Sequence, residues 1–437
     1  MRPALKNPLL FLAMAGLLAA VGFGQSWSVA LTILNLCLIS AIMALGLNMQ
    51  WGYAGLFNVG VMGFAALGGL ATVLVSKAPV GEALAAGGWR LGVAAGVLLA
   101  TAAVVVLVRR RLGKGAIRAI VTAVIVIAGY FATRVFFDPA TEAIEAVNSA
   151  KTGYLGGLGL PIILSWGVGG VFAAGAAWFI GKVALGLRAD YFAIATLGIS
   201  EIVIAVLKNE DWLARGVKNV TGLDRPVPYE LDLQGYGWFA DSFAWLGADL
   251  PEASGVFVKL CYAVLFLAVL LAVVWLAERA LNSPWGRMMR AIRDNEDAAE
   301  AMGKDVKRRH LQIFILGSAV IGIAGAMLTT LDGQFTPGTY QPLRFTFLIW
   351  IMVIIGGSGN NWGSVLGGFL VWFVWIEAEP AGLWLMDVVT SGLDETSPLR
   401  SHLLDAAPHM RLVIMGIILL LVMRFAPRGL IPEIMRR

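Results

Sequence analysis

Long apolar runs separated by short polar segments dominate the chain. Runs of this kind close their backbone hydrogen bonds internally as helices in lipid, and they lack the residue-by-residue alternation of barrel strands. We therefore expect an all-α, polytopic transmembrane helix bundle with about ten to twelve spanning helices. Gly-rich breaks within residues 29–76 and 344–386 allow more than one count of the spanning helices there. The runs lie near residues 8–25, 29–49, 53–76, 91–108, 117–136, 161–181, 190–207, 257–277, 311–331, 344–356, 364–386 and 410–424.

Composition agrees with this pattern. Of 437 residues, 59% are hydrophobic and 14% are charged, whereas soluble domains carry about 25% charged residues. The 52 glycines suit closely packed membrane helices. A net charge of +5 is explained by basic loops, so we predict no nucleic-acid partner. Cys37 and Cys261 lie inside apolar runs and have no metal-ligand spacing.

Basic residues assign the two sides of the membrane. The segments after alternate runs are rich in Arg and Lys, which places them in the cytoplasm together with both termini. We treat residues 1–437 as a single transmembrane domain with three special regions. Residues 77–160 hold an additional hairpin around "RRRLGKGAIR", and 278–310 form a cytoplasmic loop. The third, 208–256, lies outside as a flexible linker or as a segment that folds on the membrane face or meets a partner.

The cytoplasmic loop contains a charged island, "AIRDNEDAAEAMGKDVKRRH". Asp294 or Asn295 can cap a helix, and Glu296 and Asp297 then lie in its first turn. Gly303 stands where a helix of about two turns would end. So short a helix needs a surface. It is either an ordinary amphipathic helix resting on its own bundle or bilayer, or a docking helix for a cytoplasmic partner.

The sequence resembles a known family at this point. "EDAAEAMGKD" is similar to the EAA-type loop of ABC importer permeases, an alanine-rich helix that inserts into a cleft of the ATPase. The wider chain resembles the LivM-type permeases of branched-chain amino acid importers. The family often has a "TGGxNG" stretch where this chain reads "KNVTGLDRPVP", so the resemblance leaves the substrate open. The similar segments are "LGLNMQWGYAGLFNVGVMGFAALGG", "GLRADYFAIATLGISEIVIAVL", "GRMMRAIRDNEDAAEAMGKDVKRRHLQIFILGSAVIGIAGAM", "IGGSGNNWGSVLGG" and "RFAPRGLIP".

The resemblance implies an ABC importer permease architecture in the bacterial inner membrane. It implies a substrate that is a branched-chain or other hydrophobic amino acid. The implied partners are a LivH-type permease, two ABC ATPase subunits that bind ATP and Mg, a periplasmic substrate-binding protein and membrane lipid. It implicates one set of residues in ATPase coupling: Arg290, Arg293, Asp294, Glu296, Ala298, Ala299, Glu300 and Gly303. The alternatives are a urea or short-chain amide ABC permease and, from another class, an ion-coupled secondary transporter.

Motifs for chemistry are missing from the sequence. The segment nearest to a phosphate-binding loop, "GAAWFIGKV", has the wrong glycine spacing and Val183 in place of a hydroxyl residue. No H-E-x-x-H or G-x-S-x-G motif occurs. We expect a transport subunit without an ATPase site, a cofactor or a metal in this chain.

Polar residues inside the apolar runs are candidates for a translocation path. Glu201 is ionisable within a span, which is costly in lipid. Asn35, Asn48, Asn58 and Thr196 lie in or beside spans. Each is either a contact along the path or a group that bonds and packs helices together. Four further polar residues lie at the outer end of a span, where they form either part of the entrance to the path or an ordinary loop. They are Asp332, Gln334, Thr336 and Thr339.

Overall fold

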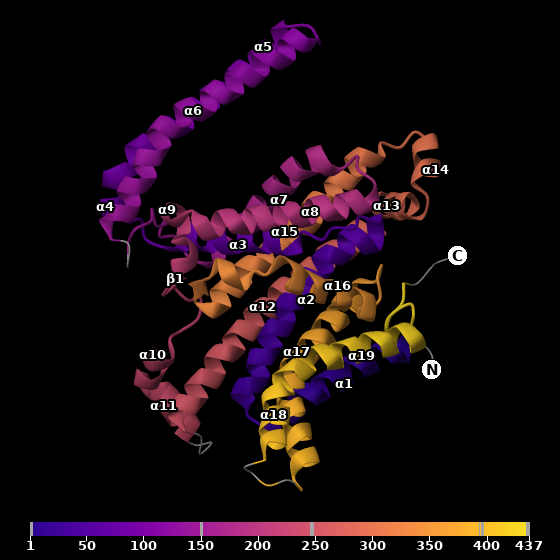
Figure 1. The fold of residues 1–437 in the computed structure, drawn as a ribbon. Helices are drawn as coiled ribbons and strands as arrows, with labels where there is room; N and C mark the ends of the chain where they lie inside the picture. Colours follow the sequence, from indigo (N-terminus) through magenta and orange to yellow (C-terminus); the bar gives the residue numbers. More distant parts are fainter. Residues whose placement is uncertain (1–2, 149–151, 245–248, 393, 395–396, 434–437) are drawn as a thin grey trace.

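The computed structural model describes residues 3–148, 152–244, 249–392, 394 and 397–433 (Figure 1). These residues are almost all helical. The longer helices are α1 (Pro3–Gly24), α2 (Trp27–Ala54), α3 (Val61–Ser76), α5 (Trp89–Arg111), α6 (Ala116–Val147), α7 (Ile163–Ala184), α8 (Ala189–Asn209), α12 (Leu250–Asn282), α13 (Pro284–Asp294), α15 (Val306–Asp332), α16 (Pro342–Gly356), α17 (Asn361–Thr390) and α19 (Met410–Phe425). The shorter elements are α4 (Gly81–Ala83), η1 (Leu84–Gly88), α9 (Asp211–Ala214), η2 (Gly216–Lys218), β1 (Val220–Thr221), α10 (Glu230–Gly235), α11 (Gly237–Ala244), α14 (Glu296–Ala301), β2 (Gln334–Phe335), η3 (Pro337–Thr339), α18 (Pro398–Ala406) and η4 (Ala407–His409).

Each predicted apolar run except 53–76 falls on one helix. Among the described residues, nine helices are long and apolar enough to cross a membrane, and the bent pair α18 and α19 raises the number to ten. Helices α3 and α16 are apolar but have only 16 and 15 residues. At 1.5 Å per residue they are about 24 Å long, less than the roughly 30 Å of a bilayer core. The predicted all-α polytopic bundle is confirmed.

Two predicted boundaries differ from the structure. The run predicted from residue 53 to 76 is interrupted, because Gly55 adopts φ +72° and ends α2 before α3 begins at Val61. The described part of the outer segment 208–256 is folded rather than a linker. Its strand β1 pairs antiparallel with β2, with Val220 opposite Phe335, and its end already belongs to α12.

Helix α15 lies at the centre of the bundle and packs against α2, α3 and α7. Small residues let the backbones touch. A Cβ on Gly68 of α3 would lie 1.9 Å from the carbonyl oxygen of Gly322. A Cβ on Gly325 would lie 2.0 Å from that of Ala65. This close approach is the usual way in which membrane helices associate, because apolar side chains gain little by leaving lipid.

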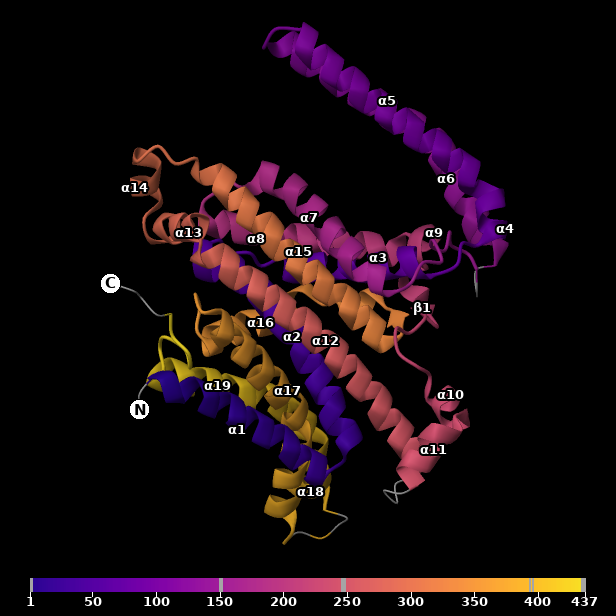
Figure 2. The same cartoon turned by 180° about the vertical axis from the view of Figure 1, so that it is seen from behind.

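The hairpin of α5 and α6 leaves this bundle. In Figures 1 and 2 it starts beside α4 and α9 and diverges from α7 and α8 toward its tip. The two helices pack on each other, and only 6% of the apolar window of each span is buried inside the protein. At the base, the backbone N–H of Trp212 donates to Glu145 over 3.2 Å. The predicted extra hairpin within 77–160 is therefore a separate arm.

The ends of the bundle can be told apart. Both views place α13 and α14 on the same side as the start of α1 and the end of α19 (Figures 1 and 2). The short outer elements α9, α10 and β1 lie toward the opposite end. This arrangement matches the alternation inferred from the basic residues.

Candidate functional site

The charged island forms a short helix that begins at a capping residue and is followed by a terminating glycine. Asn295 accepts a hydrogen bond from the backbone N–H of Ala298 over 2.9 Å, which caps α14. Gly303 has φ +76°, a left-handed conformation that suits glycine, and ends the turn that follows the helix. Asp294 is the last residue of α13 rather than the cap. The predicted helix of about two turns is therefore present, with Asn295 as the capping residue.

The free face of α14 is small and apolar. Ala298, Ala301 and Met302 are three and four positions apart, so they share one face of the turn. All three are exposed, Met302 at 79%. The acids Glu296, Asp297 and Glu300 are also exposed. By contrast, Ala299 is only 9% exposed and belongs to the interior of the protein.

Two of the predicted coupling residues face this chain itself. Arg293 donates to the backbone oxygen of Gly52 at the end of α2 and forms an ion pair of 2.9 Å with Glu433 of the C-terminal tail. It also pairs with Asp294. Burial works against its charge, but these acids outweigh burial and raise the pKa of Arg293 above its ordinary value. Arg290 donates to the backbone oxygen of Leu281 over 2.9 Å.

The loop is thus tied to three parts of the chain. Arg293 joins α13 to α2 and to the tail, while α14 leads directly into α15. A short helix anchored in this way moves with α2 and α15. The free face of α14 is left for another molecule, whereas Arg290 and Arg293 hold the loop in position.

Three of the polar candidates belong to buried hydrogen-bond networks. Asn48 donates to Asn361 over 3.2 Å and accepts from the backbone N–H of Gly359 over 2.9 Å. Asn58 donates to Gln50 over 2.7 Å, and Gln50 in turn donates to the backbone oxygen of Phe314. The bonds of Asn48 join α2 to the start of α17, and the bond from Asn58 to Gln50 fastens the non-helical link between α2 and α3. They support the interpretation of these residues as groups that hold helices together.

Thr196 takes part in the same link, while two other candidates lie apart. The Thr196 hydroxyl accepts from the backbone N–H of Val59 over 3.1 Å. Asn35 donates to the backbone oxygen of Lys259, and its own side-chain oxygen is buried with no partner among the residues that the structure describes. Glu201 is exposed on α8 and is not directed into the bundle. The structure therefore does not bring the five predicted path residues together.

Several partners in these networks were not found from the sequence. Gln50, Ser318, Asn361, Glu278 and Trp350 all donate to or accept from the candidate residues or their direct neighbours. Gln50 is a polar residue inside an apolar helix, which was the signal available, and Asn361 is the first residue of α17. Glu278 lies at the edge of the predicted cytoplasmic loop, and no separate signal in the sequence marked it.

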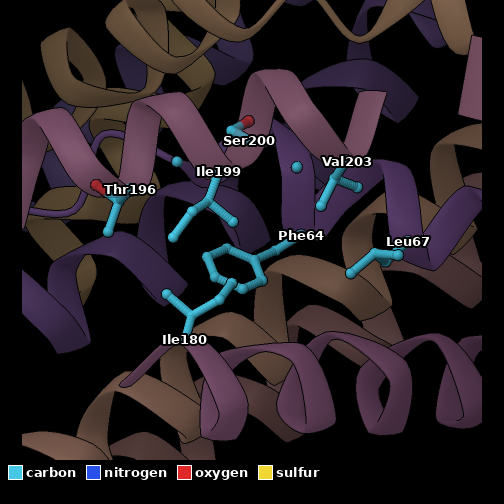
Figure 3. Close-up of a pocket in the computed structure, with 9 residues that line it drawn as sticks. Phe64, Leu67, Ile180, Thr196, Ile199, Ser200 and Val203 are labelled. Carbon is cyan, nitrogen blue, oxygen red and sulfur yellow. The ribbon is translucent and has the colours of Figure 1, made fainter. Parts of the chain in front are cut away.

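The gap between α3, α7 and α8 is almost closed. In Figure 3, Phe64, Ile180 and Ile199 point toward one another, and Thr196 lies beside them. The remaining cavity is about 10 Å³, about the space one water requires. Gly60 and Gly63 allow this contact, since a Cβ on Gly60 would lie 2.5 Å from the carbonyl oxygen of Thr196. No small molecule passes here in this conformation.

A larger cavity lies among α2, α15, α16 and α17. Its volume is about 260 Å³, and methionine and tryptophan side chains such as Met43 and Trp375 form much of its wall. Asp332 and Thr339, two of the predicted outer residues, line it. Within the described residues, Asp332 forms no hydrogen bond or ion pair. The indole N–H of Trp372, another lining residue, is buried without a partner.

Comparison with known proteins adds independent evidence. A family model described as "Branched-chain amino acid transport system / permease component" matches residues 146–423, so the match begins where the hairpin ends. The probable branched-chain amino acid transport permease protein LivM of Methanocaldococcus jannaschii is 27% identical over 302 residues, 68% of this chain and 76% of that protein. No solved structure matches the chain.

Two further relatives extend the comparison. The high-affinity branched-chain amino acid transport system permease protein LivM of Escherichia coli is 30% identical over 235 residues, which cover 52% of this chain and 53% of that protein. The chain therefore spans about half the length of this relative. The probable LivH permease protein of Methanocaldococcus jannaschii is 28% identical over 103 residues, 24% of this chain and 32% of that protein.

Proposed function

The chain belongs to the family of branched-chain amino acid transport system permease components, which are subunits of ABC importers, and from this membership we propose its specific role. We propose that it is the membrane-spanning subunit that carries branched-chain or other hydrophobic amino acids across the bacterial inner membrane. Separate ATPase subunits bind ATP and Mg and drive the cycle. A periplasmic binding protein delivers the substrate, and both termini lie in the cytoplasm.

The free apolar face of α14 is the observation that carries this proposal. Ala298, Ala301 and Met302 form a small exposed apolar knob with acidic residues around it. The rest of the loop is attached to the bundle through Arg293. Burial of such a face against a partner releases apolar surface from water. Because Arg293 links α13 to α2, a partner that moves α14 also biases the position of α2. A ligand shifts a conformational equilibrium only through such differential contacts.

The cavity beside Asp332 supports an amino acid as the substrate. Its walls suit an aliphatic side chain, and an unpaired carboxylate suits an α-ammonium group. Urea and short-chain amides, the alternative substrates in the same family, carry no ammonium group. A LivH-type permease as second membrane subunit and two ATPase subunits complete the proposed assembly.

A co-purification experiment tests the proposed coupling face. Met302→Glu adds a charge to the knob, and Arg428→Glu is the control because it places the same side chain on the tail. We expect Met302→Glu to insert normally but to lose at least tenfold of the co-expressed ATPase subunits, a change of about 1.4 kcal/mol. Arg428→Glu should retain them. Equal retention by both variants would rule out this face as the contact.

Substrate class is tested in the assembled transporter. Asp332→Asn removes the charge and keeps the shape of the side chain. We expect uptake of leucine to fall about tenfold or more, because an ion-paired hydrogen bond contributes about 1.5–3 kcal/mol. Uptake measured with urea or acetamide serves as the comparison. If the variant transports leucine as well as the wild type does, the ammonium site is not beside Asp332.

A further inference from the structure

The tip of the α5–α6 hairpin concentrates positive charge. Five cations lie within ten residues there, and the sequence from Glu82 to Asp138 contains no acid between these two. Within the described residues, none of the five has an ion-pair partner, and the ion pair between Arg134 and Asp138 lies toward the other end of α6. The five are Arg109, Arg110, Arg111, Lys114 and Arg118.

Two of these cations line a groove that continues along α6. The groove has a volume of about 470 Å³. Arg109 and Arg118 lie at its tip end, and Ala123 and Val126 lie further along it. Thr122 is between the two parts, and its hydroxyl has no hydrogen-bond partner within the described residues. Residues 118, 122 and 126 are four apart, so they follow one face of the helix.

The order of these groups matches a phospholipid. Guanidinium groups bind phosphate oxygens through paired hydrogen bonds, and the apolar part of the groove suits an acyl chain. Both helices of the hairpin are exposed along most of their length, so bilayer lipid is what surrounds them. The hairpin lies before the segment that matches the family.

We propose that the groove between Arg109 and Val126 binds one anionic phospholipid, with the phosphate between Arg109 and Arg118 and an acyl chain along Ala123. The juxtaposition of two cations and an apolar floor distinguishes this site from a general excess of positive charge. Arg110, Arg111 and Lys114 are equally cationic but do not line the groove. This distinction supplies the control.

The full-length chain is purified into detergent with equal amounts of phosphatidylglycerol and phosphatidylcholine, and bound lipid is counted by native mass spectrometry. Each cation near an anionic lipid surface contributes a factor of about five to binding. Arg109→Gln with Arg118→Gln should therefore reduce retained phosphatidylglycerol roughly 25-fold. Arg110→Gln with Arg111→Gln removes the same charge and should reduce it much less. Equal losses would overturn the groove and leave only diffuse attraction.

A second variant tests the apolar part with all cations in place. Ala123→Phe fills the groove, whereas Ala128→Phe adds the same ring to an exposed position of α6 outside it. We expect only Ala123→Phe to lose phosphatidylglycerol, with both variants monodisperse. Retention like that of the wild type would overturn the proposal. Displacement of the lipid by millimolar glycerol 3-phosphate would also overturn it, because the site would then recognise phosphate alone.

Discussion

Helix α15 and the α5–α6 hairpin are both apolar spans, but their surroundings are opposite. In α15, 56% of the apolar window is buried inside the protein, compared with 6% in each hairpin span. In a membrane protein, an apolar run shows that a segment lies within the bilayer. It does not show whether the segment contacts lipid or other helices, because apolar side chains suit both environments. Glycines of α15 such as Gly325 meet the backbone of a neighbouring helix, whereas Gly92 and Gly96 of α5 meet nothing within 4 Å.

The largest expected effect comes from filling one glycine in each region. A Cβ on Gly325 of α15 would lie 2.0 Å from the carbonyl oxygen of Ala65, whereas a Cβ on Gly96 of α5 meets nothing within 4 Å. We expect Gly325→Leu to destabilise the protein by about 3 kcal/mol or more, because rigid backbone cannot move aside. Gly96→Leu should stay within about 0.5 kcal/mol of the wild type. Thermal unfolding in detergent measures both.

Equal losses from the two glycine variants would contradict the comparison. They would mean that α5 packs against protein in the native membrane as tightly as α15 does. A partner subunit along the hairpin would then be the explanation to pursue, and the exposure of the hairpin would not reflect lipid.

The sequence predicted the helices well and their neighbours poorly. The runs near 311–331 and 91–108 were both identified as spans, since the length of an uninterrupted apolar run is enough to predict a membrane-spanning helix. Nothing in these runs shows that one is central and the other peripheral. Gly303 and one of the two expected caps, Asn295, were also identified correctly, because caps depend on a few adjacent residues.

Side-chain partners far apart in sequence were beyond such reasoning. Asn48 was a candidate for the path, but its bond to Asn361 depends on how α2 meets α17. The resemblance implicated Arg293 in ATPase coupling, but its ion pair with Glu433 depends on where the tail lies. Glu201 was expected inside the spans as a polar path residue, and the packing of α8 leaves it exposed.

A smaller effect is expected from removing one hydrogen-bonding side chain in each region. Gln50 accepts from Asn58 and donates to the Ser318 hydroxyl and to the backbone oxygen of Phe314. Gln50→Met keeps the volume but removes these three bonds and leaves the buried Asn58 amide without this acceptor, which should destabilise the protein by about 2–3 kcal/mol. In the hairpin, Thr133 donates to the backbone oxygen of Gly129 one turn earlier.

The matched hairpin variant is Thr133→Val, which should change stability by less than about 0.5 kcal/mol, because the Gly129 carbonyl retains its helical partner. Unfolding of both variants in mixed micelles with increasing sodium dodecyl sulfate gives the two values. A loss at Thr133 as large as that at Gln50 would show that the hairpin depends on internal polar contacts, against the comparison.

The smallest expected effect comes from removing the hairpin itself. Backbone hydrogen bonds already join the chain on either side of it, from Val80 to Leu155 over 3.0 Å and from Leu158 to Leu74 over 2.9 Å. Replacing residues 81–147 by a short Gly-Ser linker therefore removes mainly the contacts of Glu145 and Phe137 with Trp212. We expect a loss of about 1 kcal/mol, measured by thermal unfolding in neutral detergent, with the remaining spans inserted. A deleted chain that fails to insert would show that the bundle needs the hairpin. A deleted chain that unfolds like the wild type in neutral detergent, but no longer retains phosphatidylglycerol, would separate a bundle that holds itself together from an arm that interacts with lipid.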